Sequence, residues 1–265
     1  MKKTLPQSTY KPNPEMLKIF REVIRQGKLP KVLYKYWSIE GAMRFLETGQ
    51  ILFNCYTAFN DPFDCSANLD THNTPDEWLH FLLSQGVYGS EAIFLASKLA
   101  QNPSRGGEIL KDTIERQKLA NGIFCTSCRC DSLLMWAHYA DNHKGVCIGF
   151  DISKDMETFC PTQAVEYSDD YLSYNYLRNQ NGALSMIFRK STEWSYEHEY
   201  RTLHTDGYGL LSVRSESVKE IILGCKILAE DERRIRSLAK DMGYEAEFLR
   251  ARQSVSRYEL EIGGV

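Results

Sequence analysis

Residues 122–152 read GIFCTSCRCDSLLMWAHYADNHKGVCIGFDI, and this stretch decides the fold class. Its beginning, 122–126, and its end, 145–152, are apolar runs of the length of a strand. Between them, SLLMWAHYA at 132–140 predicts a short helix. Strands and helices mix irregularly in the rest of the chain, without a βαβ repeat. This pattern favours an α+β fold over a doubly wound sheet.

Helix and strand signals continue on both sides of this stretch. Asn13-Pro14 is a typical helix start, and Thr74-Pro75-Asp76-Glu77 has the composition of a capping box. The predicted helices span about 14–26, 38–48, 74–120 with breaks near Gly86 and Pro103, part of 171–190, and 229–243. The predicted strands span about 31–37, 51–53, 163–167, 192–204 and 219–224, with one or two edge strands after residue 244.

Composition limits the class of protein. The chain has 265 residues, 43% of them hydrophobic and 12% aromatic, and a formal net charge of −3. These values exclude intrinsic disorder and a nucleic-acid-binding polycation. Because no internal repeat is visible, we expect residues 13–265 to form a single domain after a flexible tail at 1–12. Small, mostly antiparallel sheets flanked by helices are expected.

The sequence gives no membrane or export signal. No apolar run approaches the ~18–20 residues of a membrane span, and the start MKKTLPQSTYKPNP lacks the apolar segment of a signal peptide. We therefore expect a cytoplasmic protein with no membrane partner, whose eight cysteines stay reduced.

TEWSYEHEYRTLH (192–204) carries the strongest candidate for chemistry. On a strand, Glu197, Glu199 and Arg201 share one face, and the two glutamates lie roughly 6.5–7 Å apart. Such a pair suits a site in which one carboxylate orients a hydroxyl and the other activates an attacking group. A solvated strand face, with Arg201 neutralising its neighbours, is the alternative. The opposite face is aromatic and is expected to pack in the core; it carries Trp194, Tyr196, His198 and Tyr200.

KVLYKYW (31–37) places Lys35 between two tyrosines, Tyr34 and Tyr36. A cation with neighbouring aromatic surfaces and hydroxyls can hold a phosphate or a flat heterocycle. The alternative is a strand lysine whose aliphatic stem packs on the protein while its ammonium reaches solvent.

The cysteines and histidines do not predict a metal site. Cys125, Cys128 and Cys130 form CxxCxC near His138 and His143, but a second CxxC is missing. We expect no metal, because cysteines on apolar strands behave as small hydrophobic residues. His138 is expected to be a buried, hydrogen-bonded histidine. FNDPFD (59–64) predicts a turn anchored by its two phenylalanines.

Four motifs together resemble a bacterial family catalogued as domain of unknown function 2971. The similarity covers about residues 32–224, and the string MWAHYADNHKG is its most specific part. The motifs, in chain order, are LYKYWS (33–38), FNDPFD (59–64), LLMWAHYADNHKGVCIGFD (133–151) and EWSYEHEYR (193–201). The family implies no activity.

The layout is also similar to that of ADP-ribosyltransferases, which use NAD. YKYWSIEGAMRFLETGQILF (34–53) follows the first strand and helix of those enzymes, with Lys35 where they have a histidine. Near the end, YEHEYRTLH (196–204) resembles the strand that presents their catalytic glutamate. The resemblance implies that Glu199 is this glutamate and that Glu197 deprotonates the acceptor.

The same resemblance implies an NAD site in a cleft between two small sheets. Lys35, the segment 136–139 and Glu199 are expected to converge there. The implied cofactor-binding residues are Lys35 and Tyr36 at the ribose or pyrophosphate, Trp136 or Tyr139 against the nicotinamide, and His138.

The leading hypothesis is therefore an NAD-dependent ADP-ribosyltransferase-like enzyme, a toxin or defence effector. Its acceptor is an unidentified macromolecule or small molecule, with nucleic acid expected only as a substrate. A non-catalytic nucleotide- or partner-binding module is the first alternative. A metal-dependent hydrolase or nuclease using His138, His143 and the glutamates is the second.

Overall fold

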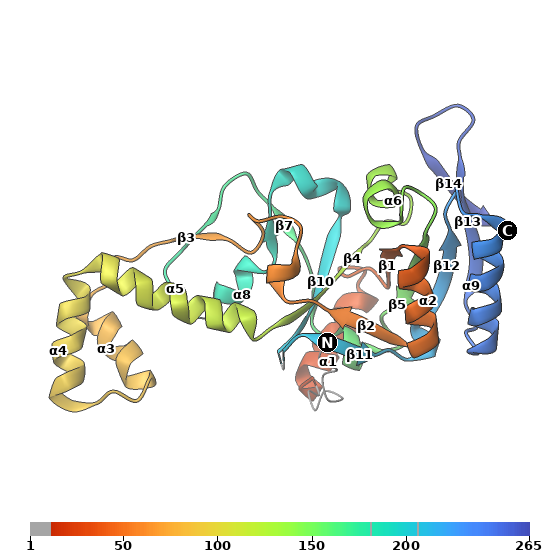
Figure 1. Ribbon diagram of the computed structural model, residues 1–265. Coiled ribbons are helices and arrows are strands. Elements are labelled where there is room, and N and C mark those ends of the chain that lie inside the picture. Colours follow the sequence, from red (N-terminus) through yellow and green to blue (C-terminus); the bar gives the residue numbers. More distant parts are fainter. Residues whose placement is uncertain (1–11, 181, 206) are drawn as a thin grey trace. The chain divides into compact units, whose positions relative to one another are not determined.

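The computed structural model describes residues 12–180, 182–205 and 207–265 (Figure 1). Residues 1–11 of the predicted tail lie outside this range. The described residues divide into two compact units. Unit 1 takes its residues from Met1–Cys55, Gly122–Val165 and Glu193–Val265, and unit 2 from Tyr56–Asn121 and Glu166–Thr192. The single domain expected from the sequence stays a prediction.

Unit 1 is built on one eight-stranded sheet (Figure 1). Neighbouring strands are antiparallel, except that β12 and β13 run parallel. This arrangement confirms the α+β class. In spatial order the strands are β14 (Leu260–Gly264), β13 (Glu247–Gln253), β12 (Val218–Leu223), β5 (Val146–Asp151), β1 (Val32–Trp37), β4 (Gly122–Ser127), β10 (Glu199–His204) and β6 (Thr162–Ala164).

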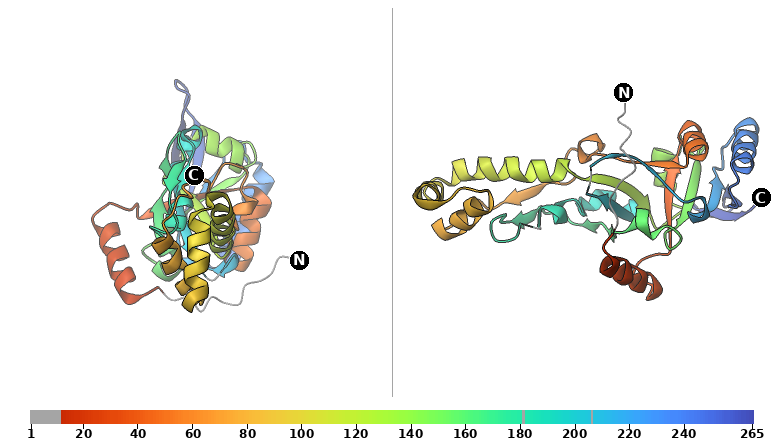
Figure 2. Two further views of the ribbon diagram at one scale, coloured as in Figure 1. Left: turned by 90° about the vertical axis from the view of Figure 1, so that its left-hand side faces the viewer. Right: turned by 90° about the horizontal axis from the view of Figure 1, so that it is seen from below.

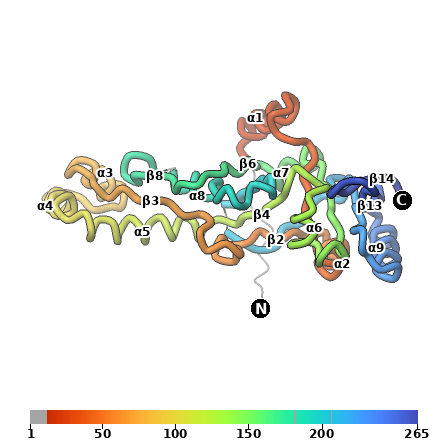
Figure 3. Tube along the Cα trace, turned by 90° about the horizontal axis from the view of Figure 1, so that it is seen from above, coloured from red at the N-terminus to blue at the C-terminus, as the bar shows by residue number. Residues whose placement is uncertain are grey.

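One face of this sheet, the α2 face, carries the larger core. Leu33, Phe124 and Ile148 point to this face and are at most 2% exposed. Helices α2 and α9 pack together beside it (Figures 1 and 3). The elements that contribute to this core are α1 (Pro14–Arg25), α2 (Ile39–Thr48), α7 (Met156–Phe159), α9 (Ala229–Asp241) and the two-stranded ribbon of β2 (Gln50–Phe53) and β11 (Gly209–Ser212).

The opposite face, the α6 face, carries Tyr36, Cys147 and Ile222. It is covered by α6 (Leu133–Tyr139), whose Met135 and Trp136 are buried against these strand residues. Because β5 is buried along its whole length, both faces of the sheet are packed at its centre. The 3-10 helix η3 (Ser215–Ser217) leads into β12.

Local signals explain where several helices begin. The Asn13 side chain accepts from the backbone N–H of Glu15 at the start of α1, as the Asn13-Pro14 pair predicted. Thr74 and Glu77 form the predicted capping box at the start of α3. These predictions succeed because a capping hydrogen bond is made within four residues of sequence.

The predicted strand at 192–204 is only half correct. Thr192–Glu197 forms the 3-10 helix η2, and the strand β10 begins at Glu199. His198 between them has a φ of 44°, in the left-handed region, which interrupts an extended chain. The alternation in 192–198 is between aromatic and charged residues rather than between core and solvent positions, so it did not require a strand.

Unit 2 is mainly helical. A buried cluster that includes Trp78, Phe81 and Leu110 holds its three longest helices together. The breaks predicted near Gly86 and Pro103 separate these helices. The elements are η1 (Tyr56–Ala58), β3 (Ala67–Leu69), α3 (Pro75–Ser84), α4 (Gly89–Ala100), α5 (Pro103–Leu119), β7 (Glu166–Tyr167), β8 (Leu172–Tyr174), α8 (Gly182–Met186) and β9 (Arg189–Lys190), with β3–β8 and β7–β9 as parallel pairs.

Among the described residues, no helix combines the length and apolar composition needed to cross a membrane.

Candidate functional site

The start of β10 carries a buried ion pair. Glu199 and Arg201 lie two residues apart and share the α6 face. The Arg201 guanidinium donates from Nε and Nη2 to the two Glu199 carboxylate oxygens, at 2.8 and 2.9 Å. Arg201 is fully buried and Glu199 is 5% exposed. The pair is bidentate, which is the strongest geometry for such an interaction.

Glu197, the last residue of η2, is the second buried carboxylate and is 3% exposed. The Tyr139 hydroxyl at the end of α6 donates to Glu197 Oε1 at 2.6 Å. The Ser127 hydroxyl at the end of β4 donates to the backbone carbonyl of Glu197 at 2.6 Å. Glu197 is therefore held from α6 and from β4.

His198 separates the two glutamates in a left-handed conformation. This conformation costs a residue with a Cβ roughly 1–2 kcal/mol. The backbone N–H of Cys128 donates to the His198 carbonyl at 3.1 Å and fixes the turn. Strained, well-fixed residues are common at functional sites, although the strain alone does not identify one.

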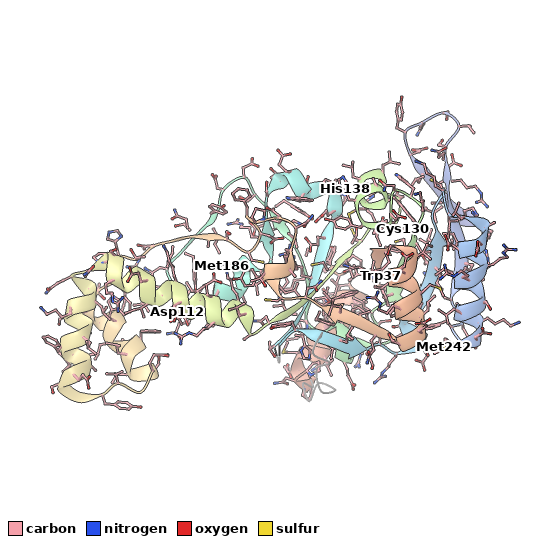
Figure 4. All side chains as sticks on the ribbon, in the orientation of Figure 1. Trp37, Asp112, Cys130, His138, Met186 and Met242 are labelled. Atoms are coloured by element: carbon pink, nitrogen blue, oxygen red, sulfur yellow. The ribbon has the colours of Figure 1, made fainter. Side chains whose placement is uncertain are left out.

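The residues of α6 divide into buried and exposed positions. Trp136 is fully buried and donates from Nε1 to the Cys130 carbonyl at 2.8 Å. His138 is exposed, and its Nδ1 lies 3.1 Å from the Tyr196 hydroxyl (Figure 4). The expected burial of His138 is therefore wrong, because its position faces away from Trp136 on a short helix.

Lys35 does not join this cluster. Its Cα partner is Ile148 on the α2 face, whereas Tyr34 and Glu199 both pair with Ser127 on the α6 face. The Lys35 ammonium donates to the Cys125 carbonyl at 2.8 Å, 5.3 Å from the centre of the Phe124 ring. The structure thus separates Lys35 from Glu199, contrary to the expected convergence. The cofactor role of Lys35 stays a prediction.

Tyr36 lies on the α6 face and is buried, with 3% of its surface exposed. Its hydroxyl donates to the Arg129 carbonyl at 2.8 Å. Burial raises the pKa of Tyr36 far above its usual value, so the phenol stays protonated. Tyr36 and Trp136 meet edge to face, with ring centres 5.3 Å apart. Both residues act as packing side chains in this structure.

Cys125 lies beside the carboxylate cluster, since its Cα partner on β10 is Arg201. Burial, followed by the negative charge of Glu199, raises the pKa of the Cys125 thiol. The thiol is therefore protonated and a poor nucleophile at neutral pH. Within the described parts of the chain, no three or more His, Cys, Asp or Glu side chains are arranged to hold a metal ion.

Unit 2 contains a separate group of buried charges that the sequence did not reveal. Lys190 Nζ lies 3.8 Å from Asp64 Oδ2, and both side chains are at most 5% exposed. Lys118 donates to the Cys65 carbonyl at 3.2 Å and pairs with Glu115 at 2.7 Å. Only Asp64 of FNDPFD belongs to a motif that the sequence analysis singled out. Lys190 on β9 and Lys118 on α5 lie in no distinctive sequence pattern.

The FNDPFD turn itself is partly as expected. Asp61 Oδ1 accepts from the backbone N–H of Phe63 at 2.9 Å, as turn chemistry predicts. Phe63 is 65% exposed, however, so it does not anchor the turn. The buried carboxylates Asp61 and Asp64 occupy the place expected for the aromatic anchors.

The family model described as "Protein of unknown function (DUF2971)" matches residues 135–202. The expected similarity to this family is thereby confirmed over a segment that contains most of α6, all of β5 and both glutamates of the cluster. Searches of the curated proteins and of the solved structures found no match. The comparisons give no support to the resemblance to ADP-ribosyltransferases.

Proposed function

We propose that the chain is an enzyme that cleaves the N-glycosidic bond of NAD, as an ADP-ribosyltransferase does, and that Glu197 is its main catalytic carboxylate. The observation that supports this proposal is the pair of buried carboxylates on either side of His198, each with its own hydrogen-bond donor. Burying a carboxylate costs free energy unless it is compensated.

The two carboxylates accept hydrogen bonds from side chains on different elements. Arg201 neutralises Glu199 through two hydrogen bonds. Glu197 accepts a hydrogen bond from the Tyr139 hydroxyl on α6. Because the Arg201 guanidinium holds Glu199 in a bidentate geometry, we assign Glu199 to a positioning role and Glu197 to the reacting centre. The resemblance had implied the catalytic role for Glu199 and the role of acceptor base for Glu197.

The proposed chemistry needs one negative charge beside a ribose. When the bond between the ribose and nicotinamide breaks, its electron pair leaves with nicotinamide and positive charge develops on the ribose carbon. A fixed carboxylate stabilises this oxocarbenium-like state. Water or an acceptor then donates an electron pair to the same carbon and loses a proton. Tyr139 and Ser127 hold Glu197 in place for this step.

The test is NAD turnover by Glu197→Gln, measured together with its free energy of unfolding. Gln removes the charge but can still accept from Tyr139. Turnover should fall about 10²–10³-fold, while stability falls by no more than about 1.5 kcal/mol, the value of one hydrogen bond. Glu245→Gln, which removes an exposed glutamate, is the matched control and should match the unchanged protein.

Tyr139→Phe provides a second variant. It removes only the hydroxyl that orients Glu197 and should lower turnover about tenfold. Unchanged turnover in Glu197→Gln would remove this residue from the mechanism, and with it the proposal.

One observation favours a second candidate, a non-catalytic module that binds a nucleotide. Both carboxylates have hydrogen-bond partners within the chain, as expected where side chains shape a binding surface rather than react. In that case NAD would raise the melting temperature and be recovered unchanged after long incubation.

A further inference from the structure

A cavity in unit 1 has a volume of about 440 Å³. Three segments line it: the turn after α6, the turn after β12, and the hairpin between β13 and β14. The side chains with polar chemistry that line it include His143, Lys226, Ser254, Arg257, Tyr258 and Glu259. The volume is within the range of cavities that hold small molecules, about 300–1,000 Å³.

Two of the turns at this cavity are joined by backbone hydrogen bonds. The backbone N–H of Lys226 donates to the His143 carbonyl, and that of Gly224 donates to the Gly145 carbonyl, each at 3.0 Å. A Cβ at Gly224 would lie 2.2 Å from the His143 carbonyl oxygen, so the two turns approach more closely than any other residue allows. Their spacing is therefore fixed before a ligand binds.

The charges that line the cavity suit an anion. Lys226 and Arg257 bring two cations from separate segments, against the single carboxylate of Glu259. His143 Nδ1 is buried and has no hydrogen-bond partner in the described part of the chain. An unpartnered buried nitrogen costs about as much free energy as a lost hydrogen bond.

The hairpin adds an aromatic side chain. The backbone N–H of Ser254 donates to the Glu259 carbonyl at 3.1 Å and closes a loop that extends beyond its strands (Figures 1 and 2). Tyr258 is fully exposed in this loop, and Arg257 precedes it. A free tyrosine ring next to an arginine is suited to stacking on a flat heterocycle while the cation binds a phosphate.

We propose that this cavity binds a nucleoside monophosphate. Lys226 and Arg257 bind the phosphate, Glu259 accepts from the ribose hydroxyls, and Tyr258 stacks on the base. The site is separate from Glu197 and Glu199 and does not depend on their proposed reaction.

The experiment is calorimetric titration of the full chain with AMP, adenosine and inorganic phosphate. AMP should bind at least tenfold more tightly than either fragment. Lys226→Ala and Arg257→Ala should each weaken AMP binding about tenfold or more, because a charge-assisted hydrogen bond is lost. Lys240→Ala and Arg233→Ala remove exposed cations of the same types on α9 and should leave binding unchanged.

The outcomes separate this site from the proposed enzyme. Glu197→Gln should keep AMP binding, and Lys226→Ala should keep NAD turnover. Unchanged AMP binding in Lys226→Ala and Arg257→Ala would overturn the proposal, as would an equal loss in the α9 controls. Equal affinity for phosphate and AMP would overturn the nucleoside assignment.

Discussion

At the scale of single residues, Glu197 and Glu199 have different partners although only one residue separates them. Glu199 is tied to a fully buried guanidinium, and Glu197 to a phenol on α6. The left-handed turn at His198 makes this difference possible. Chemical identity and spacing predicted a pair of carboxylates with separate roles, but did not reveal which side chain holds each of them.

The first prediction concerns Glu199→Gln. This change removes the carboxylate charge that the buried Arg201 guanidinium pairs with at 2.8 Å, so the free energy of unfolding should fall by about 3–5 kcal/mol. Chemical denaturation beside the Glu245→Gln control measures the loss. A loss below 1 kcal/mol, on the order of an exposed pair, would show that solvent reaches Arg201.

The second prediction concerns the pH dependence of stability at His143. Burial, followed by the charge of Lys226, lowers the pKa of His143 from its usual 6.5. The unfolded chain then binds more protons than the folded protein below about pH 6.5, so stability from this group is present above that pH and is lost as the pH falls. Urea unfolding at pH 7.5 and 5.5 should show a smaller loss for His143→Gln than for the unchanged protein. Equal losses would contradict the lowered pKa.

At the scale of elements, the turn after β12 approaches the turn after α6 closely at Gly224. Gly224→Ala places a methyl group 2.2 Å from the His143 carbonyl oxygen. The two turns are joined by backbone hydrogen bonds, and moving either turn away would break these bonds. Glycine directly after the end of β12 at Leu223 is therefore explained by the close approach of the two turns rather than by local propensity.

The third prediction follows from this contact. Gly224→Ala should reduce the free energy of unfolding by about 2–3 kcal/mol, as expected for overpacking. Gly264→Ala is the control, since a Cβ there meets nothing within 4 Å, and its effect should stay within about 0.5 kcal/mol. Thermal or chemical unfolding of the two variants makes the comparison. Equal stability of Gly224→Ala and Gly264→Ala would show that the two turns can move apart at little cost in free energy.

Elements whose signals are local could be predicted from the sequence. The helix starts at Asn13 and Thr74 depend on hydrogen bonds within a few residues. The face on which Lys35 lies could not be related to that of Glu199, because this relation depends on the register of β1 against β4 and of β4 against β10. The register joins residues far apart in sequence, and no local pattern encodes it. The ion pair of Lys190 with Asp64 was missed for the same reason.

At the scale of the whole molecule, the eight cysteines are all free in the structure. Four of them are buried, and four are partly buried. Burial raises the pKa of every partly buried thiol, so these thiols are also slow to react. The buried cysteines are Cys55, Cys65, Cys147 and Cys160.

The fourth prediction is a thiol count. Eight thiols should react with a disulfide reagent at pH 8 after unfolding, and no more than four within the first minutes when the protein is folded. The melting temperature should not change when a reductant is added, because the structure contains no disulfide among its cysteines. Fewer than eight thiols after unfolding without reductant would contradict the structure.

The strand order of the main sheet also has a consequence for synthesis. Strand β1 is the first of the eight to leave the ribosome, but it lies between β4 and β5. Both neighbours are synthesised only after residues 56–121 of unit 2. Strand β10 is synthesised only after the second segment of unit 2, residues 166–192. Until then β1 exposes two unpaired edges, which invite incorrect pairing. Assembly of this sheet is therefore a late event in translation, dominated by contacts between distant parts of the chain, which form slowly.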